Sequence, residues 1–218
     1  MKNLLDWNAI DTVLLDLDGT LLDLAFDSYF WHEVIPQHYG DAHGLEAVEA
    51  RAEIAPMFRA CEGTIDWYCV DYWSRTLQLD VMAIKQSHRE RVRWLPGAQE
   101  FLRELRERGK RVVMLTSSHP KVLALKHERT QVCDHFDAVF TSHEFGMPKE
   151  DARYWSALRK VEEFDPRRTL FVDDNLAVLR SALAADIAFL RAVRRPDSMA
   201  PPREQDEFTA VDAVNELL

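Results

Sequence analysis

Cysteine is scarce in this sequence, and its scarcity excludes two classes of small protein. Only Cys61, Cys69 and Cys133 occur among 218 residues. Three scattered cysteines are too few for a disulfide framework, and they lack the paired spacing of a Cys-based zinc site. The histidines show no HExxH-like spacing either. We therefore expect three partly buried apolar side chains in a reducing compartment.

Long hydrophobic runs and an excess of basic residues are also missing. Residues 1–13 contain no unbroken apolar stretch, and no window approaches the ~20 apolar residues of a membrane span. We therefore expect a soluble cytoplasmic protein with no signal peptide and no membrane contact. The net charge of −10 disfavours binding to a nucleic acid polymer or an anionic membrane. A small phosphorylated substrate stays open, because a bound cation can reverse the local field.

Short apolar runs are present, and they predict the fold class. Four of them, at 12–18, 111–117, 137–142 and 168–174, are rich in Val, Leu and Phe, and 187–193 is a weaker fifth. Continuous apolar runs of this length indicate strands that are buried on both faces, as in a parallel sheet. Helical patterns separate the runs. This alternation predicts an α/β fold built on a doubly wound parallel sheet.

The predicted helices follow from apolar spacing and from end signals such as Pro120 and Gly109. The C-terminal stretch 194–208 is polar and rich in proline, which is typical of an irregular loop. Residues 209–218 are expected to form a short helix. The helices predicted between the strands cover residues 96–110, 120–130, 149–164 and 175–186.

Residues 25–94 interrupt the alternation of strands and helices. This stretch is rich in aromatic residues and has helical patterns but no clear strand. The sequence LPG at 95–97 marks the return to the α/β pattern. We therefore predict a helical insert (residues 25–94), acting as a cap, on a catalytic core made of residues 1–24 and 95–218.

Polar residues gather where the predicted strands end. In open α/β sheets, ligands bind beyond the carboxyl ends of the strands, so these side chains are expected to share one rim. Four nearby carboxylates repel one another unless a divalent cation lies among them, and oxygen ligands favour Mg²⁺ over zinc. The residues on this rim are Asp16, Asp18, Thr116, Ser117, Ser118, Lys149, Asp173 and Asp174.

This combination suits phosphoryl transfer. A bound Mg²⁺ and the ammonium of Lys149 would attract a phosphate and offset its charge. Hydroxyls and loop N–H groups can hold the other phosphate oxygens. Asp16 and Asp18 point to the same face if the strand continues, so both could address one phosphorus. One carboxylate can attack, and the other can exchange protons with the leaving oxygen and with water. Gly19 lets the chain turn sharply beside them.

The motifs together resemble those of the haloacid dehalogenase (HAD) superfamily. The resemblance rests on DLDGT at 16–20, Thr116 after VVML, Lys149 in MPKED and FVDD at 171–174, in that order. It implies a Rossmann-like core with a helical cap inserted after the first motif. Longer runs outside these motifs, at 11–31, 66–74, 116–120, 145–151 and 195–198, are similar to the GMP/IMP 5′-nucleotidase branch of that superfamily. This closer resemblance covers nearly the whole chain. It implies dephosphorylation of purine nucleoside monophosphates, with a small nucleotide as the binding partner.

The resemblance also implies residue roles. Asp16 is implied as the nucleophile that forms an aspartyl-phosphate, and Asp18 as the general acid and base. Thr116 would bind phosphate and Lys149 would stabilise charge. Ser117 departs from the family pattern, which often has Asn, but its backbone N–H should still serve. Ser118 and His119 are as consistent with a helix start before Pro120 as with substrate binding. The implied magnesium ligands are Asp16, the main-chain carbonyl of Asp18, Asp174 and, directly or through another ligand, Asp173.

Several alternatives remain open from the sequence. Phe26, Asp27 and Tyr29 follow the catalytic loop and are candidates to contact the nucleobase, with packing inside the insert as the alternative. Trp67 and Trp73 are expected to pack in the insert. Asp23 is expected to make a local bond to the backbone. The runner-up function is a phosphatase or phosphomutase for a small sugar phosphate or phosphoglycolate. Dehalogenation and a non-catalytic binding role are less favoured, and the sequence does not indicate an oligomeric state.

Overall fold

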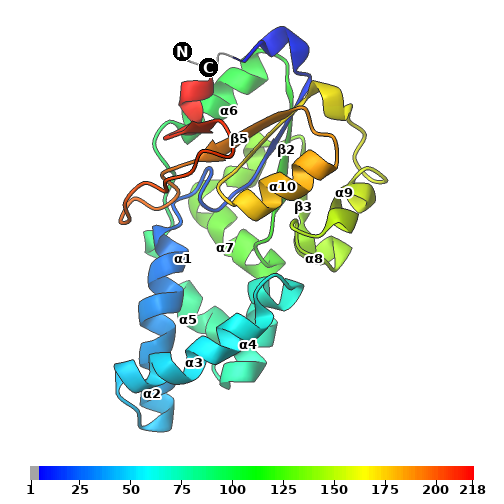
Figure 1. Cartoon of the computed structure of the whole chain (residues 1–218). Helices are drawn as coiled ribbons and strands as arrows, with labels where there is room; N and C mark the ends of the chain where they lie inside the picture. Colours follow the sequence, from blue (N-terminus) through cyan, green and yellow to red (C-terminus); the bar gives the residue numbers. More distant parts are fainter. Residues whose placement is uncertain (1–4) are drawn as a thin grey trace.

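A six-stranded, all-parallel sheet forms the centre of the computed structural model, which describes residues 5–218 (Figure 1). The strand order is β3-β2-β1-β4-β5-β6, which is Rossmann-like and doubly wound, as predicted. The strands are β1 (Thr12–Leu15), β2 (Arg111–Thr116), β3 (Ala138–Thr141), β4 (Thr169–Asp173), β5 (Phe189–Val193) and β6 (Ala210–Val211).

Helices cover both faces of the sheet because its side chains are apolar on both sides. Val13 and Leu15 of β1 pack with α6, whereas Leu14 points the other way and packs with α9 and α10. All three side chains are fully buried. The helices of this part are α6 (Ala98–Glu107), α7 (Pro120–Thr130), α8 (Ser142–Phe145), α9 (Ala152–Leu158) and α10 (Leu176–Ala184), with short turns η1 (Trp7–Ala9), η5 (Val132–His135), η6 (Pro166–Arg168) and η7 (Val214–Leu217).

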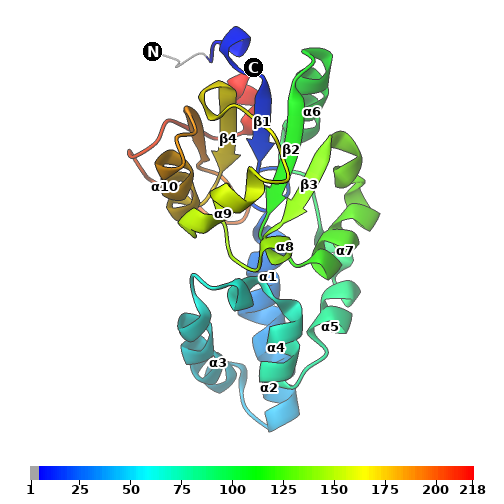
Figure 2. The ribbon, with the colours of Figure 1, turned by 90° about the vertical axis from the view of Figure 1, so that its right-hand side faces the viewer.

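The helical insert lies beyond the carboxyl ends of the strands (Figure 2). Its own apolar cluster includes Phe30, Ile54 and Trp73, each at most 1% exposed. None of the helices in residues 5–218 is long and apolar enough to cross a membrane. The elements of the insert are α1 (Ala25–Tyr29), the π-helical η2 (Phe30–Val34), α2 (Ile35–His43), α3 (Ala47–Cys61), η3 (Ile65–Tyr68), α4 (Val70–Leu77), α5 (Val81–Ser87) and η4 (Arg89–Arg91).

The chain enters and leaves the insert at two neighbouring points. The backbone N–H of Asp23 donates to the carbonyl of Arg93 at 2.9 Å. The Asp23 carboxylate accepts from the N–H of Ala25 at 3.0 Å, which is the local bond expected from the sequence. It also accepts from the N–H and the hydroxyl of Ser198, at 3.0 and 2.6 Å. The connection to the insert is therefore held to a distant C-terminal loop.

Two sequence predictions differ from the structure near the ends of elements. Residues 209–218 do not form one helix: Ala210 and Val211 pair with β5 as the edge strand β6, and only the turn η7 follows. A two-residue strand has too little sequence pattern to be recognised without its partner. The helix expected over 149–164 is limited to α9, because the Asp151 side chain caps its start and the chain continues as turns after Leu158.

Candidate functional site

The carboxyl ends of the strands open onto a cavity of about 820 Å³ between the sheet and the helical insert. This volume lies within the range of ligand-binding pockets. Eight of the residues predicted from the sequence border this cavity, although they come from four separate strand ends. They are Asp16, Asp18, Thr116, Ser117, Ser118, Lys149, Asp173 and Asp174.

Lys149 joins two of these carboxylates. Its Nζ lies 2.5 Å from Oδ1 of Asp16, 2.7 Å from Oδ2 of Asp173 and 3.1 Å from the carbonyl of Leu115. The lysine is 2% exposed. Burial by itself would lower the pKa of Lys149, but the two carboxylates hold that pKa well above its usual value. The ammonium is therefore a fixed positive charge on the floor of the cavity.

Three aspartates form an acidic cluster beside this ammonium. Carboxylate oxygens of Asp16, Asp173 and Asp174 all lie within 4.8 Å of one another. Burial, with the repulsion between these neighbouring groups, raises the pKa of Asp16 and of Asp174 to about 7 and that of Asp173 to about 6. Oδ2 of Asp16 is buried and has no hydrogen-bond partner among residues 5–218. An oxygen-only cluster with an unpartnered buried carboxylate oxygen fits a hard divalent cation.

Gly19 allows the first and fourth strand ends to approach each other. Its backbone has a φ of +91°, and a Cβ atom placed there would lie 2.7 Å from the carboxylate of Asp174 and 2.9 Å from Pro196. Both the conformation and the contact require glycine. The sequence predicted a sharp turn at Gly19, and the structure adds the close packing against Asp174.

Arg203 is a member of the site that the sequence analysis did not identify. Its guanidinium donates to Oδ2 and to the main-chain carbonyl of Asp174, at 2.7 and 3.0 Å, and it borders the cavity. Arg203 belongs to the proline-rich loop that follows β5. A single arginine in a polar loop carries no distinguishing sequence pattern, because its position depends on how that loop folds back over β4.

Asp18 belongs to a second network of charged side chains, which the sequence did not predict. Its Oδ1 accepts from Nζ of Lys126 at 2.6 Å, and the same ammonium donates to Oδ2 of Asp27 at 2.7 Å. Oδ1 of Asp27 accepts from Nζ of Lys85, again at 2.7 Å. Lys126 lies on α7 of the core, whereas Asp27 and Lys85 belong to the insert. The network therefore links a predicted catalytic residue to the insert.

The two lysines of this network are almost completely buried, with 1% of Lys85 and 2% of Lys126 exposed. Burial raises the pKa of Asp18, although Lys126 opposes this. Burial would also raise the pKa of Asp27, but the two ammonium groups hold it well below its usual range. The sequence signal for this network is weak. Each lysine lies four residues after an apolar residue, so both share one face of their helix. The pairs are Val122 with Lys126 on α7 and Val81 with Lys85 on α5.

Hydroxyl groups occupy the ends of the second and third strands. Thr116 is buried, and its Oγ1 accepts from the N–H of Ser118 at 3.0 Å. The hydroxyls of Ser117 and Ser142 lie 3.2 Å apart. This arrangement presents a turn of backbone beside the acidic cluster. Such turns supply N–H donors to anions.

The aromatic residues on the cavity wall differ from those predicted. Phe26 is 2% exposed and packs beneath α7, and Tyr29 packs against His88 and the guanidinium of Arg91. Neither borders the cavity, whereas Asp27, which was a candidate with them, does. Successive helical residues are rotated by about 100°, so Ser28 and Trp31 face the cavity in place of Phe26 and Tyr29. Trp67 from η3 also lies on this wall, together with Phe58 and Trp73.

Further polar contacts join the insert to the core around the cavity. The hydroxyl of Tyr68 donates to Oε1 of Glu150 at 2.7 Å, and the side-chain amide of Asn175 donates to the same oxygen at 3.1 Å. Nζ of Lys121 lies 2.7 Å from Oδ1 of Asp71. Together with the network of Lys126, these contacts hold the insert over the strand ends.

Comparisons with known proteins identify related sequences. A family model described as haloacid dehalogenase-like hydrolase matches residues 10–186. The chain is 37% identical to the GMP/IMP nucleotidase YrfG of Escherichia coli over 212 residues, which cover 97% of this chain and 96% of that protein. It is 26% identical over 151 residues to a ribulose-1,5-bisphosphate 5-phosphatase of Halopiger xanaduensis, covering 63% of this chain and 60% of the relative.

Solved structures give the same fold. A crystal structure of an HAD phosphatase from Thermococcus onnurineus matches with a TM-score of 0.77, covering 95% of this chain and 96% of that one. The two sequences are 21% identical. At this identity the match concerns the fold alone.

Proposed function

Because this chain belongs to the haloacid dehalogenase-like hydrolase family and is a phosphoric monoester hydrolase, we propose that it dephosphorylates purine nucleoside 5′-monophosphates such as GMP and IMP. The observation that carries the proposal is the composition of the cavity. One side has the acidic cluster and Lys149, and the other has the aromatic rings of Trp31 and Trp67. A nucleotide has the same two halves, a charged phosphate and a flat base.

In the proposed reaction, Asp16 and Asp18 divide the chemistry. A carboxylate oxygen of Asp16 attacks phosphorus while the bond from phosphorus to the ribose oxygen breaks, and Asp18 gives its proton to that oxygen. This releases the nucleoside and leaves an aspartyl-phosphate. Asp18 then takes a proton from water as the water oxygen attacks phosphorus. The bond between phosphorus and the Asp16 oxygen breaks, phosphate leaves, and both carboxyl groups return to their starting protonation states.

Other residues position and neutralise the phosphate. Lys149 places a fixed positive charge next to Asp16. The backbone N–H of Ser117, in the turn after Thr116, is proposed to hold a phosphate oxygen. We propose Mg²⁺ as the cofactor, held by Asp16, Asp174, the Asp18 carbonyl and, directly or through a water, Asp173. When bound, the ion supplies positive charge that offsets the repulsion between these carboxylates and the phosphate.

The helical insert is proposed to act as a cap that selects the substrate. Trp31 and Trp67 offer flat apolar surfaces of the kind on which a purine stacks. The two charged contacts of Lys126 and Lys121 would keep the cap closed while bulk water is excluded from the reacting phosphate. The 37% identity with a GMP/IMP nucleotidase extends through the insert as well as the core and supports this assignment.

The test is phosphate release from a panel of monoesters in the presence and absence of Mg²⁺. GMP and IMP are compared with AMP, pyrimidine nucleotides, ribose 5-phosphate, phosphoglycolate and β-glycerol phosphate. We expect Mg²⁺-dependent release with the highest kcat/KM for GMP or IMP. A preference for a sugar phosphate would replace the nucleotidase proposal with the sugar-phosphatase alternative. Release that is independent of Mg²⁺ would contradict the proposed metal site.

A further inference from the structure

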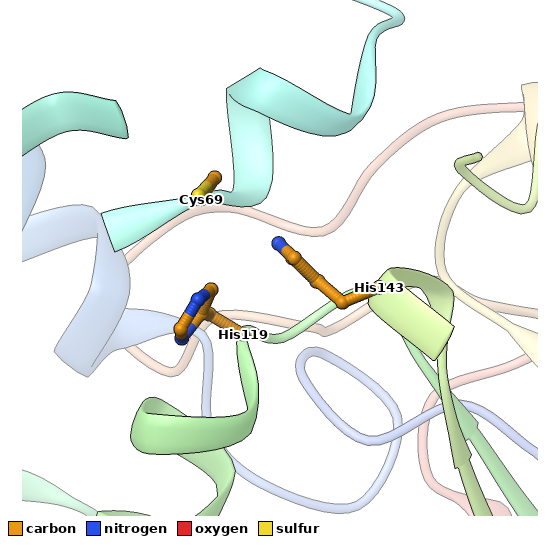
Figure 3. A group of neighbouring side chains, drawn as sticks. All are labelled: Cys69, His119 and His143. Atoms are coloured by element: carbon orange, nitrogen blue, oxygen red, sulfur yellow. The ribbon is translucent and has the colours of Figure 1, made fainter. Parts of the chain in front are cut away.

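A group of potential metal ligands lies apart from the acidic cluster, where the insert meets the core. Cys69 precedes α4 of the insert, His119 precedes α7, and His143 lies on α8 (Figure 3). The Cys69 sulfur and a ring nitrogen from each histidine lie within 4.8 Å of one another. The two imidazole rings are 4.6 Å apart and nearly perpendicular, at 78°. Three residues that are distant in sequence therefore converge from three separate elements.

Among the described residues, His143 has no hydrogen-bond partner that would explain its position. Neither Nδ1 nor Nε2 makes a hydrogen bond within the described part of the chain, and both atoms are buried. An imidazole always carries at least one N–H donor and, when neutral, one acceptor, so leaving both unpaired is costly. A bound ion would satisfy one nitrogen directly.

The other two ligands are only weakly engaged. The Cys69 sulfur accepts one long bond from the N–H of Tyr72, at 3.4 Å. Nδ1 of His119 accepts from the N–H of Lys121 at 3.3 Å, and Nε2 of His119 lies 3.8 Å from Oδ2 of Asp71. Coordination through Nδ1 would leave the Nε2–H facing a carboxylate, which is the usual arrangement behind a metal-bound histidine.

We propose that Cys69, His119 and His143 bind a Zn²⁺ ion that links the helical insert to the core. One thiolate and two imidazoles are the ligands of zinc, whereas the oxygen-only acidic cluster suits a harder cation. Zinc bonds of about 2.0 to 2.3 Å require the three ligand atoms to move inward by about 1 Å, which side-chain rotation can supply. A water molecule would complete the tetrahedron.

The proposed ion would restrain the helical insert relative to the core. His119 directly follows Ser118 and borders the same cavity, and Cys69 follows Tyr68, which already contacts Glu150 of the core. An ion held by one ligand from the insert and two from the core would restrain their separation. The spacing of cysteines and histidines in the sequence does not indicate this site, because the three ligands come from distant segments.

Binding is tested on the full chain in saturating Mg²⁺, so that the acidic cluster is occupied. Zn²⁺ affinity is measured by competition with a chromophoric chelator, and Co²⁺ replaces Zn²⁺ to reveal the absorption band of a cobalt–thiolate bond. We expect one tight equivalent of Zn²⁺ and the thiolate band in the unmodified protein. Cys69→Ser should abolish the band and weaken Zn²⁺ binding about tenfold or more, and His143→Gln should weaken it similarly.

Two matched variants make the test decisive. Cys133→Ser removes a half-buried thiol outside the group, and Asp174→Asn alters the acidic cluster; both should retain the band and the Zn²⁺ affinity. Serine is a good helix cap, so Cys69→Ser preserves the start of α4. Zn²⁺ binding that survives Cys69→Ser, or that is lost in Asp174→Asn instead, would overturn the proposal. Failure of the unmodified protein to bind Zn²⁺ more tightly than Cys69→Ser would overturn it as well.

The linking role has its own measurement. Hydrogen exchange of backbone amides is compared with and without Zn²⁺, and we expect slower exchange both at the start of α4 and in α8. Slower exchange on only one side of the interface would show that the ion does not link the insert to the core. Neither this measurement nor the binding assay depends on the identity of the phosphorylated substrate.

Discussion

Removing the negative charge of Asp27 should lower the free energy of unfolding, because this charge compensates two buried lysines. Its carboxylate lies 2.7 Å from the ammonium groups of both Lys85 and Lys126. The network contains two positive charges and two negative charges, the second carboxylate being Asp18. In Asp27→Asn the shape is nearly preserved, but Lys85, which is 1% exposed, loses its only carboxylate partner among the described residues. One buried positive charge is then left without compensation.

The size of the effect follows from the burial of this charge. Removing one partner of a buried ion pair costs about 3 to 5 kcal/mol. For a chain of this size each kcal/mol lowers the melting temperature by about 2 to 4 °C, which gives a decrease of about 6 to 20 °C. The assay is thermal unfolding followed by circular dichroism, with urea unfolding as the independent measure of the free energy.

Two further variants separate the charge from other effects. Asp41→Asn removes an exposed aspartate that bonds Gln37 on α2, and it should change the free energy of unfolding by less than about 0.5 kcal/mol. In Asp27→Asn combined with Lys85→Met, only the balanced pair of Lys126 and Asp18 remains. We expect this double variant to regain most of the lost stability. If Asp27→Asn costs no more than Asp41→Asn, or the double variant is as unstable as the single one, the reasoning is refuted.

Three other predictions concern the site. Asp16→Asn should abolish phosphate release while the circular dichroism spectrum and melting temperature are retained, and measurable turnover would remove Asp16 from its proposed role. Burial raises the pKa values of Asp16, Asp173 and Asp174 from 3.8 to about 6 or 7. The folded, metal-free chain therefore keeps these protons to a higher pH than the unfolded chain does. The resulting contribution to the free energy of unfolding is fully present below about pH 4 and is lost as the pH rises through 6 to 7. Mg²⁺ competes with those protons, so it should raise the melting temperature more at about pH 8 than at about pH 5, and equal increases would contradict the acidic site. Trp31→Leu should raise KM for GMP by about 5- to 150-fold, from a stacking energy of about 1 to 3 kcal/mol, while KM for β-glycerol phosphate stays the same; a parallel change in both would exclude base stacking.

The sequence predicted the core of the fold because its signals are local. Each of the first four strands is a short, largely apolar run, which is fully buried in β1 and β4 and only partly buried in β3. The polar residues of the rim follow these runs. A period of two or of 3.6 residues is visible without knowledge of the tertiary structure. For this reason the sequence alone places Asp16, Asp18, Asp173 and Asp174 at one edge of the sheet.

What the sequence could not supply depends on contacts between distant segments. Arg203 reaches Asp174 only because a proline-rich loop folds across β4, and Lys126 reaches Asp27 only because α7 packs on the insert. Of the three candidates for contact with the base, Asp27 borders the cavity and Phe26 and Tyr29 do not, whereas Ser28 and Trp31 border it as well. Such a difference is set by the rotation of α1 against the core, and helical periodicity alone does not determine that rotation.

The points where the chain enters and leaves the insert lie side by side, and this has a consequence for evolution. Asp23 and Arg93 are joined by a backbone hydrogen bond of 2.9 Å, so the core presents two adjacent chain ends at this point. A short turn could connect these ends without changing the strand order, because no strand of the sheet lies between them in the chain. The insert can therefore be exchanged, lengthened or redesigned as a unit, while the residues that carry the chemistry keep their places in the sheet.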